Sequence, residues 1–284
     1  MWIVFSFIYA IANAFYINYN AKRHYNGYVL GMLRGYGVSL SIAPLLVTLP
    51  LDIPTNYLVI LIIQGILIGI YDSRIFFASA KYGGHIGYGF MATAVLITTF
   101  LWWIADFSSL QHLLNTPYRL ITIILILSAY SVSYWQMMKV KINKSAEQYL
   151  YPAVFALALM SIATRYIALR GGTARAGIIY YLTISCFVSG IYNTIMYYKN
   201  LPQQTKTPTI KDSVWLIFFS IILIAAKTEA MRICSNPGYV VAILLTSPLI
   251  AAPFSRHRFK IIPSLMLNIC FLILLLWFIE TKLS

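Results

Sequence analysis

Residues 57–80 read YLVILIIQGILIGIYDSRIFFASA, an apolar run whose only charged residues are Asp72 and Arg74. About 20 mostly apolar residues are enough for a helix to cross the hydrocarbon core of a bilayer. The run is continuous rather than divided into short segments of alternating polarity, which argues against a membrane β-barrel. This stretch therefore predicts a transmembrane helix.

Runs of the same kind recur along the chain, separated by short links rich in Pro, Gly, Asn and basic residues. The predicted helices are residues 1–19, 28–48, 57–80, 85–104, 119–138, 150–169, 177–198, 213–231, 238–254 and 261–278. The first run lacks a basic leader and a small-residue cleavage site, so we expect it to be a retained helix. The prediction is an all-α membrane protein with ten transmembrane helices.

The composition supports this fold class. Of the 284 residues, 60% are hydrophobic and 10% are charged, whereas a soluble domain carries about 25% charged residues. This excludes a soluble enzyme. The 21 Lys and Arg residues against 7 Asp and Glu residues give a net charge of +14. Because basic loops orient membrane helices, we assign this excess to orientation in the bilayer and expect no nucleic-acid partner.

The two halves of the chain, residues 1–145 and 146–284, show weak internal similarity. Residues 67–74 (LIGIYDSR) align with residues 222–229 (ILIAAKTE), so that charged positions coincide with opposite signs. Five helices per half would place the halves in opposite orientations, an arrangement typical of secondary transporters. We therefore expect two inverted five-helix repeats that together form one transmembrane domain.

Charged side chains inside the predicted helices are the first candidates for a functional site. An intramembrane charge needs a partner or a water-filled cavity, because it is costly to place in hydrocarbon. The candidates are Asp72, Arg74, Arg165, Lys227 and Glu229, with Arg34 near a helix end. If the third and eighth helices meet across a two-fold axis, Asp72 would pair with Lys227 and Arg74 with Glu229. Such pairs either hold the bundle together or are opened by substrate or protons.

Side chains with polar tips are expected to line a central cavity beside these charges. They are Asn13, Tyr16, Tyr71 and Tyr166, together with Arg34. The Cys and His residues show no metal-ligand spacing, and the glycine-rich links lack the Lys-Ser/Thr of a phosphate-binding loop. We therefore expect no metal, no cofactor and no catalytic residue.

Two short motifs resemble the drug/metabolite transporter superfamily, of the EamA type, and the ten-helix pattern extends the similarity over nearly the whole chain. Met32-Leu33-Arg34-Gly35-Tyr36 is similar to the family's Arg early in helix two. Pro237-Gly238, followed by LLTSPL at residues 244–249, is similar to its short link and Pro-containing helix nine. The family's Gly-Glu after helix nine is replaced by residues 255–258 (SRHR), so the chain resembles a divergent member.

The predicted function is a secondary active transporter with alternating access. It would move a small organic metabolite across the membrane, by export or exchange, with protons or a counter-substrate as the coupling partner. The expected location is the bilayer of a bacterial inner membrane. The loop charges predict that both termini are outside, whereas the resemblance implies that they are inside. The alternatives are a membrane-embedded transferase, a lipid or lipid-linked-sugar flippase, and a non-catalytic membrane subunit.

Overall fold

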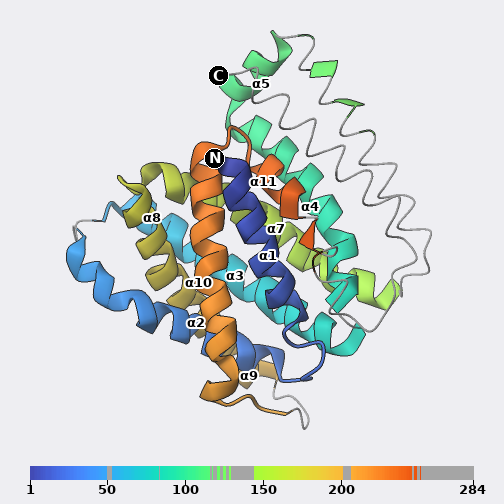
Figure 1. The fold of residues 1–284 in the computed structure, drawn as a ribbon, viewed down its shortest axis with the longest axis vertical. Helices are drawn as coiled ribbons and strands as arrows, with labels where there is room; N and C mark the ends of the chain where they lie inside the picture. The colour runs from blue at the N-terminus through green and yellow to red at the C-terminus, as the bar shows by residue number, and fades with distance from the viewer. Residues whose placement is uncertain are drawn as a thin grey trace.

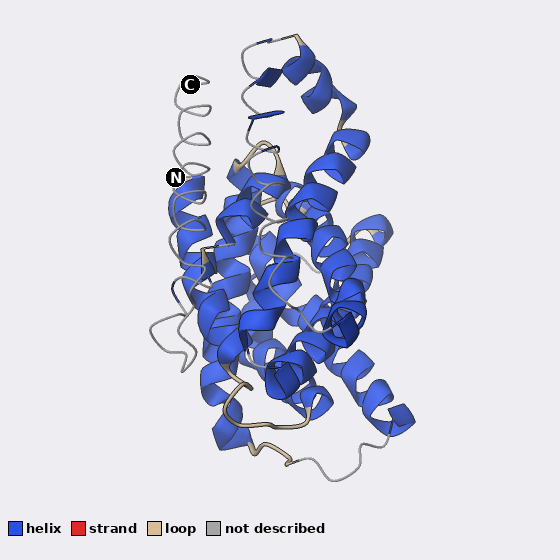
Figure 2. Cartoon of the chain, turned by 90° about the vertical axis from the view of Figure 1, so that its right-hand side faces the viewer, coloured by secondary structure: helices blue, strands red, loops and turns tan. Residues whose placement is uncertain are grey.

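The computed structural model shows a bundle of packed helices (Figure 1). It describes residues 1–49, 53–82, 84–115, 144–200 and 206–244, and isolated positions at 117–128 and 246–250. The α-helices are α1 Trp2–Asn18, α2 Gly27–Ile42, α3 Thr55–Tyr82, α4 Gly84–Ala105, α5 Phe107–Leu114, α7 Lys144–Arg170, α8 Ala174–Tyr180, α9 Cys186–Asn200, α10 Ile210–Ile233 and α11 Pro237–Leu244. A 3₁₀ segment, η1 Ala43–Thr48, follows α2, and a π-helical segment, η2 Tyr181–Ser185, joins α8 to α9. Figure 2 draws only helices and loops over the described residues.

Side-chain caps explain where several of these helices begin. The first backbone N–H groups of a helix lack partners within the helix, and short polar side chains supply them. The Asn26 side chain accepts hydrogen bonds from the first turn of α2. Thr173 caps α8 in the same way, and Thr209 forms a reciprocal capping box with Asp212 at the start of α10.

The polarity of α1 is reversed relative to a helix on the surface of a soluble protein. Its apolar side chains Val4, Ile8, Ile11 and Phe15 recur at helical spacing and are exposed, whereas the polar side chains of Ser6, Asn13 and Tyr16 are buried. Apolar side chains that face outward match lipid rather than water. Five helical stretches are long and apolar enough to cross a membrane: Gly27–Thr48, Thr55–Tyr82, Gln148–Arg170, Ala174–Asn200 and Ile210–Ile233. The architecture indicates an integral, multi-pass membrane protein.

Close helix packing in the centre depends on glycines spaced four residues apart. The α2 sequence contains Gly27, Gly31 and Gly35, and α3 contains Gly65 and Gly69. Helix α9 packs against both α2 and α3. A Cβ atom on Gly35 would lie 2.7 Å from the backbone oxygen of residue 186, and one on Gly65 would lie 2.6 Å from that of residue 185. These glycines therefore let α9 pack between α2 and α3, as small-xxx-small motifs do in membranes.

Most described helices lie where the sequence predicted them, with differences at two places. The predicted helix at 177–198 is divided by η2, and residues 107–114, expected to be a link, form the short α5. Of the predicted helix at 238–254, α11 covers the first part. The predicted helices at 119–138 and 261–278 lie largely or wholly outside the described residues. The count of ten helices and the inverted repeat stay predictions.

Candidate functional site

A buried ion pair joins α2 to α3. Arg34 Nη1 lies 3.2 Å from Asp72 Oδ2, and each side chain is only 3% exposed. The pair sits inside a bundle whose outer face is apolar, where an isolated charge would be costly. The pairing explains how both charged side chains can be buried inside the bundle.

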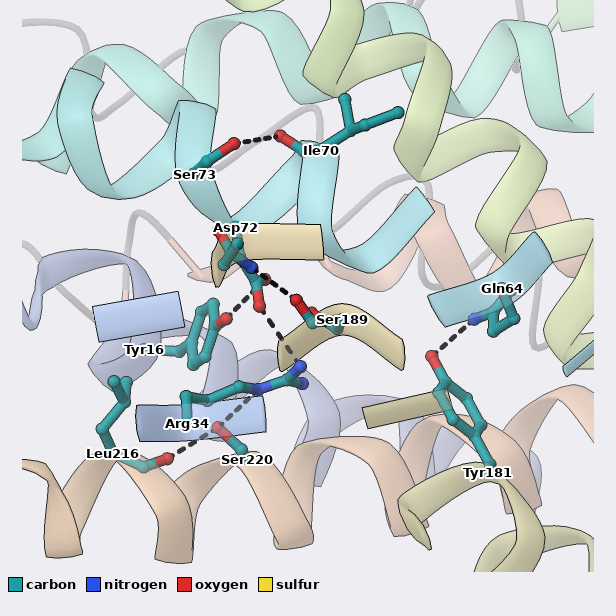
Figure 3. Close-up of polar contacts among 11 residues, drawn as sticks. Tyr16, Arg34, Gln64, Ile70, Asp72, Ser73, Tyr181, Ser189, Leu216 and Ser220 are labelled. Carbon is teal, nitrogen blue, oxygen red and sulfur yellow. Dashed lines mark hydrogen bonds and ion pairs between the residues drawn. The ribbon is translucent and has the colours of Figure 1, made fainter. Parts of the chain in front are cut away.

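Two hydroxyl groups, from α1 and α10, contact this pair (Figure 3). The Tyr16 hydroxyl of α1 donates to Asp72 Oδ1 at 2.5 Å, and Arg34 Nε donates to Ser220 Oγ of α10 at 3.3 Å. Ser220 in turn donates to the Leu216 backbone oxygen at 2.6 Å, and the guanidinium lies 5.7 Å from the centre of the Tyr16 ring. Tyr16, Arg34, Asp72 and Ser220, hereafter the Arg34 cluster, thus come from four helices.

A second polar group crosses the bundle at Gln64 of α3. Gln64 Nε2 donates to Tyr181 Oη of η2 at 2.6 Å and to Thr164 Oγ1 of α7 at 3.1 Å. The Gln64 amide oxygen is buried without a hydrogen-bond partner. Within η2, the Thr183 backbone oxygen accepts from Ser39 Oγ at 2.8 Å. π-Helical segments are frequent at functional sites, and this one contributes Tyr181 to the interior.

A third polar group is Lys227 of α10, whose side chain is completely buried. Its Nζ atom has no hydrogen-bond partner, and it lies 6.0 Å from the centre of the Tyr9 ring of α1. The pairing predicted between Lys227 and Asp72 is wrong, because Asp72 pairs with Arg34 instead. The physical reason is the order of packing: α3 packs mainly on α7 and α9, whereas α10 packs mainly on α1.

The predicted pair of Arg74 and Glu229 is also wrong. Glu229 accepts two hydrogen bonds from Arg232, one turn further along α10, at 3.0 and 2.6 Å. The Arg74 guanidinium lies 4.5 Å from the centre of the Tyr149 ring on α7. Glu229 therefore pairs with a residue of its own helix, and Arg74 packs against a ring on the neighbouring α7.

The remaining predicted residues divide between the interior and the end of the bundle. Asn13 is buried and donates to Ser247 Oγ at 3.4 Å, and Tyr71 is buried next to Asp72 in the chain. Arg165 instead donates to the backbone oxygens of Met231 and Arg232 at the C-terminus of α10. Tyr166 packs against Trp102, with ring centres 5.9 Å apart.

Arg165 caps the last turn of α10, which indicates that this side chain stabilises the helix end. We expect Arg165→Gln to lower the free energy of unfolding by about 1–2 kcal/mol, since carbonyl acceptors at a helix end lose a cationic donor. Arg175→Gln is the matched control, because Arg175 makes one exposed contact of 3.4 Å to Thr48. Unfolding in mixed micelles measures both, and equal stabilities would contradict this role.

Sequence reasoning found the charged members of the site and some of the neutral ones, and missed several other neutral residues. Asn13, Tyr16, Arg34, Asp72 and Lys227 lie in the interior as expected, although their partners differ. The missed residues are Tyr9, Gln64, Thr164, Tyr181 and Ser220. Gln64 could have been predicted from the sequence, because it is an amide side chain in the middle of a mostly apolar run.

These side chains can bind a polar or charged solute, and the ionisable ones can gain or lose a proton. The described residues contain no group of three or more His, Cys, Asp or Glu that could hold a metal ion. They do place a carboxylate, a guanidinium, an ammonium, phenols and an amide in one interior. No protein-family model matches the chain, and no curated protein matches it either.

Proposed function

We propose that the chain is a secondary active transporter that moves a small organic metabolite by alternating access. The observation that carries this proposal is the Arg34 cluster, a buried ion pair between α2 and α3 that also receives hydroxyl contacts from α1 and α10. Ionisable groups inside a membrane bundle typically mark a substrate or ion pathway. The proposed direction of transport is export or exchange. The proposed location is a bacterial inner membrane.

The proposal includes ten helices arranged as two inverted halves, residues 1–145 and 146–284. Transporters of this kind bind their solutes where the two repeats meet. Tyr16, Arg34 and Asp72 belong to the first half and Ser220 to the second, so the cluster bridges the two. The resemblance to the drug/metabolite transporter superfamily supports the same arrangement.

The ion pair provides a simple means of coupling. A proton on Asp72, or a counter-substrate that binds Arg34, would weaken the contact between α2 and α3. Release of that contact would free the two helices to move relative to one another, and the Tyr16 hydroxyl would follow the carboxylate. A ligand shifts such an equilibrium by its differential affinity for the two conformations.

Among the other function classes, a membrane-embedded transferase would need carboxylates grouped around a metal and a diphosphate. Of the acidic side chains that the structure describes, Asp72 is the one that is buried in the bundle, and it is paired with Arg34. This favours transport over group transfer. A flippase would use the same alternating motion on a lipid-linked solute.

A thermal-shift screen of the purified protein tests the proposal. The panel contains amino acids, nucleosides, cofactors and lipid head groups, because a ligand of the folded state raises its stability. We expect one class to raise the melting temperature. Tyr16→Phe should weaken its binding about tenfold, since Asp72 loses the hydroxyl donor that holds it in place in the Arg34 cluster. A panel without any stabilising compound would contradict a solute-binding function.

A further inference from the structure

Of the Asp, Glu, Lys and Arg side chains that are buried in the described part of the chain, Lys227 is the one without a partner of opposite charge. Its side chain is 0% exposed, and its Nζ atom has neither a hydrogen-bond partner nor a salt bridge among the described residues. Its nearest recorded neighbour is the face of the Tyr9 ring at 6.0 Å, at the outer limit of a cation–π contact. Removing an ammonium group from water without such compensation is costly.

The position of Lys227 relates it to the Arg34 cluster. Lys227 lies seven residues after Ser220 on α10, so the two share one helix face about 10 Å apart. Tyr9 and Tyr16 have the same spacing on α1, with Asn13 between them on the same face. Helices α1 and α10 lie side by side (Figure 1).

These two faces meet at two levels of the bundle. At one level, Tyr16 and Ser220 both contact Arg34. At the other level, Tyr9 lies beside Lys227. The first level contains a basic side chain with its carboxylate, whereas the second contains a basic side chain without one. The seam between α1 and α10 therefore holds one amine that lacks an acidic partner among the described residues.

We propose that Lys227 binds the anionic group, a carboxylate or a phosphate, of the transported solute. This inference rests on the proposed transport function and specifies its substrate class as an organic anion. The ammonium supplies the charge, while the Tyr9 ring and the Asn13 amide on the facing helix supply an aromatic surface and a polar contact. The Lys227 site is closed to solvent in this conformation, so the solute enters it when α1 and α10 separate.

The test compares solutes that differ only in charge. Purified wild-type protein is heated with glutarate or glutaramide, with benzoate or benzamide, and with inorganic phosphate at matched ionic strength. We expect at least one anion to raise the melting temperature by about 3 °C or more, and its neutral counterpart to have no effect. In Lys227→Met the affinity for that anion falls at least about tenfold, and Lys227→Arg retains part of it.

Arg74→Met is the matched control, since it removes a cation that already has an aromatic partner; it leaves anion binding unchanged. Stabilisation by neutral or cationic solutes alone overturns the assignment and leaves the transport function standing. Phosphate binding that persists in Lys227→Met also overturns it. Failure of every solute to bind or cross a membrane contradicts the transport function itself.

The stability of Lys227→Met without ligand gives an independent readout. Because the ammonium lacks a partner, replacement by an apolar side chain of similar length should raise the melting temperature by about 5 °C. A lower melting temperature would show that the ammonium stabilises the bundle through a structural contact. That result would overturn the inference whatever the transport assays show.

Discussion

Asp72→Asn is expected to lower the free energy of unfolding by about 3–5 kcal/mol, because it leaves the Arg34 guanidinium buried without its counter-charge. The Asn side chain has nearly the same shape, so the loss comes from charge rather than from a cavity. Tyr16 still finds an oxygen acceptor, whereas the 3.2 Å ion pair disappears. Reversible unfolding in mixed micelles measures the loss of free energy. We expect the melting temperature to fall by about 10 °C.

Glu229→Gln is the matched control for this prediction, since it also removes the acid of an ion pair. The Glu229 and Arg232 side chains are 17% and 40% exposed, and such pairs contribute at most about 1 kcal/mol. Replacing both members of the buried pair, in Arg34→Met with Asp72→Leu, should recover most of the stability. Equal stability of Asp72→Asn and Glu229→Gln would show that the Arg34 cluster does not stabilise the bundle.

Gly35→Leu is expected to be the most disruptive single change among the packing residues, with a loss of more than about 3 kcal/mol. A Cβ atom at Gly35 would lie 2.7 Å from two backbone atoms of α9, the residue 186 oxygen and the Gly190 nitrogen. Backbone atoms cannot rotate away as side chains do, so α2 and α9 must separate. Melting temperature and the yield of monodisperse protein measure the outcome.

Gly37→Leu, on the same helix, is the control for Gly35→Leu. A Cβ atom there would meet the terminal atoms of the Ile217 side chain, which can turn aside. We expect Gly37→Leu to fold with a melting temperature close to that of the wild type. A comparable loss in both variants would contradict the role of Gly35 as the contact that lets α9 approach α2.

The sequence predicted the fold class and most of the helix positions because the bilayer imposes simple requirements. Long apolar runs must be helical when no water can satisfy the backbone, and the run at 57–80 lies within α3. The division of 177–198 by η2 escaped prediction, because periodicity does not distinguish α- from π-helical turns. The spacing of Gly31 and Gly35 was visible in the sequence and would have indicated a close helix contact.

The interior location of Arg34, Asp72 and Lys227 could be predicted, whereas their partners could not. Composition shows that a charge lies in an apolar segment and therefore needs a partner. The identity of that partner depends on which helices are neighbours, and weak internal similarity placed α3 opposite α10. In the structure α3 packs on α7, α9 and α2 rather than on α10, so the carboxylate of Asp72 meets Arg34 of α2.

The most direct test of the central claim is solute counterflow in proteoliposomes loaded with the compound that stabilises the purified protein. We predict that wild-type protein accumulates the labelled solute against its gradient. Tyr16→Phe should slow this uptake about tenfold, and Lys227→Met should slow it at least as much, while Arg74→Met should not. Uptake no faster than in protein-free liposomes, or equal uptake by all four proteins, would contradict a transport site built on the Arg34 cluster and Lys227.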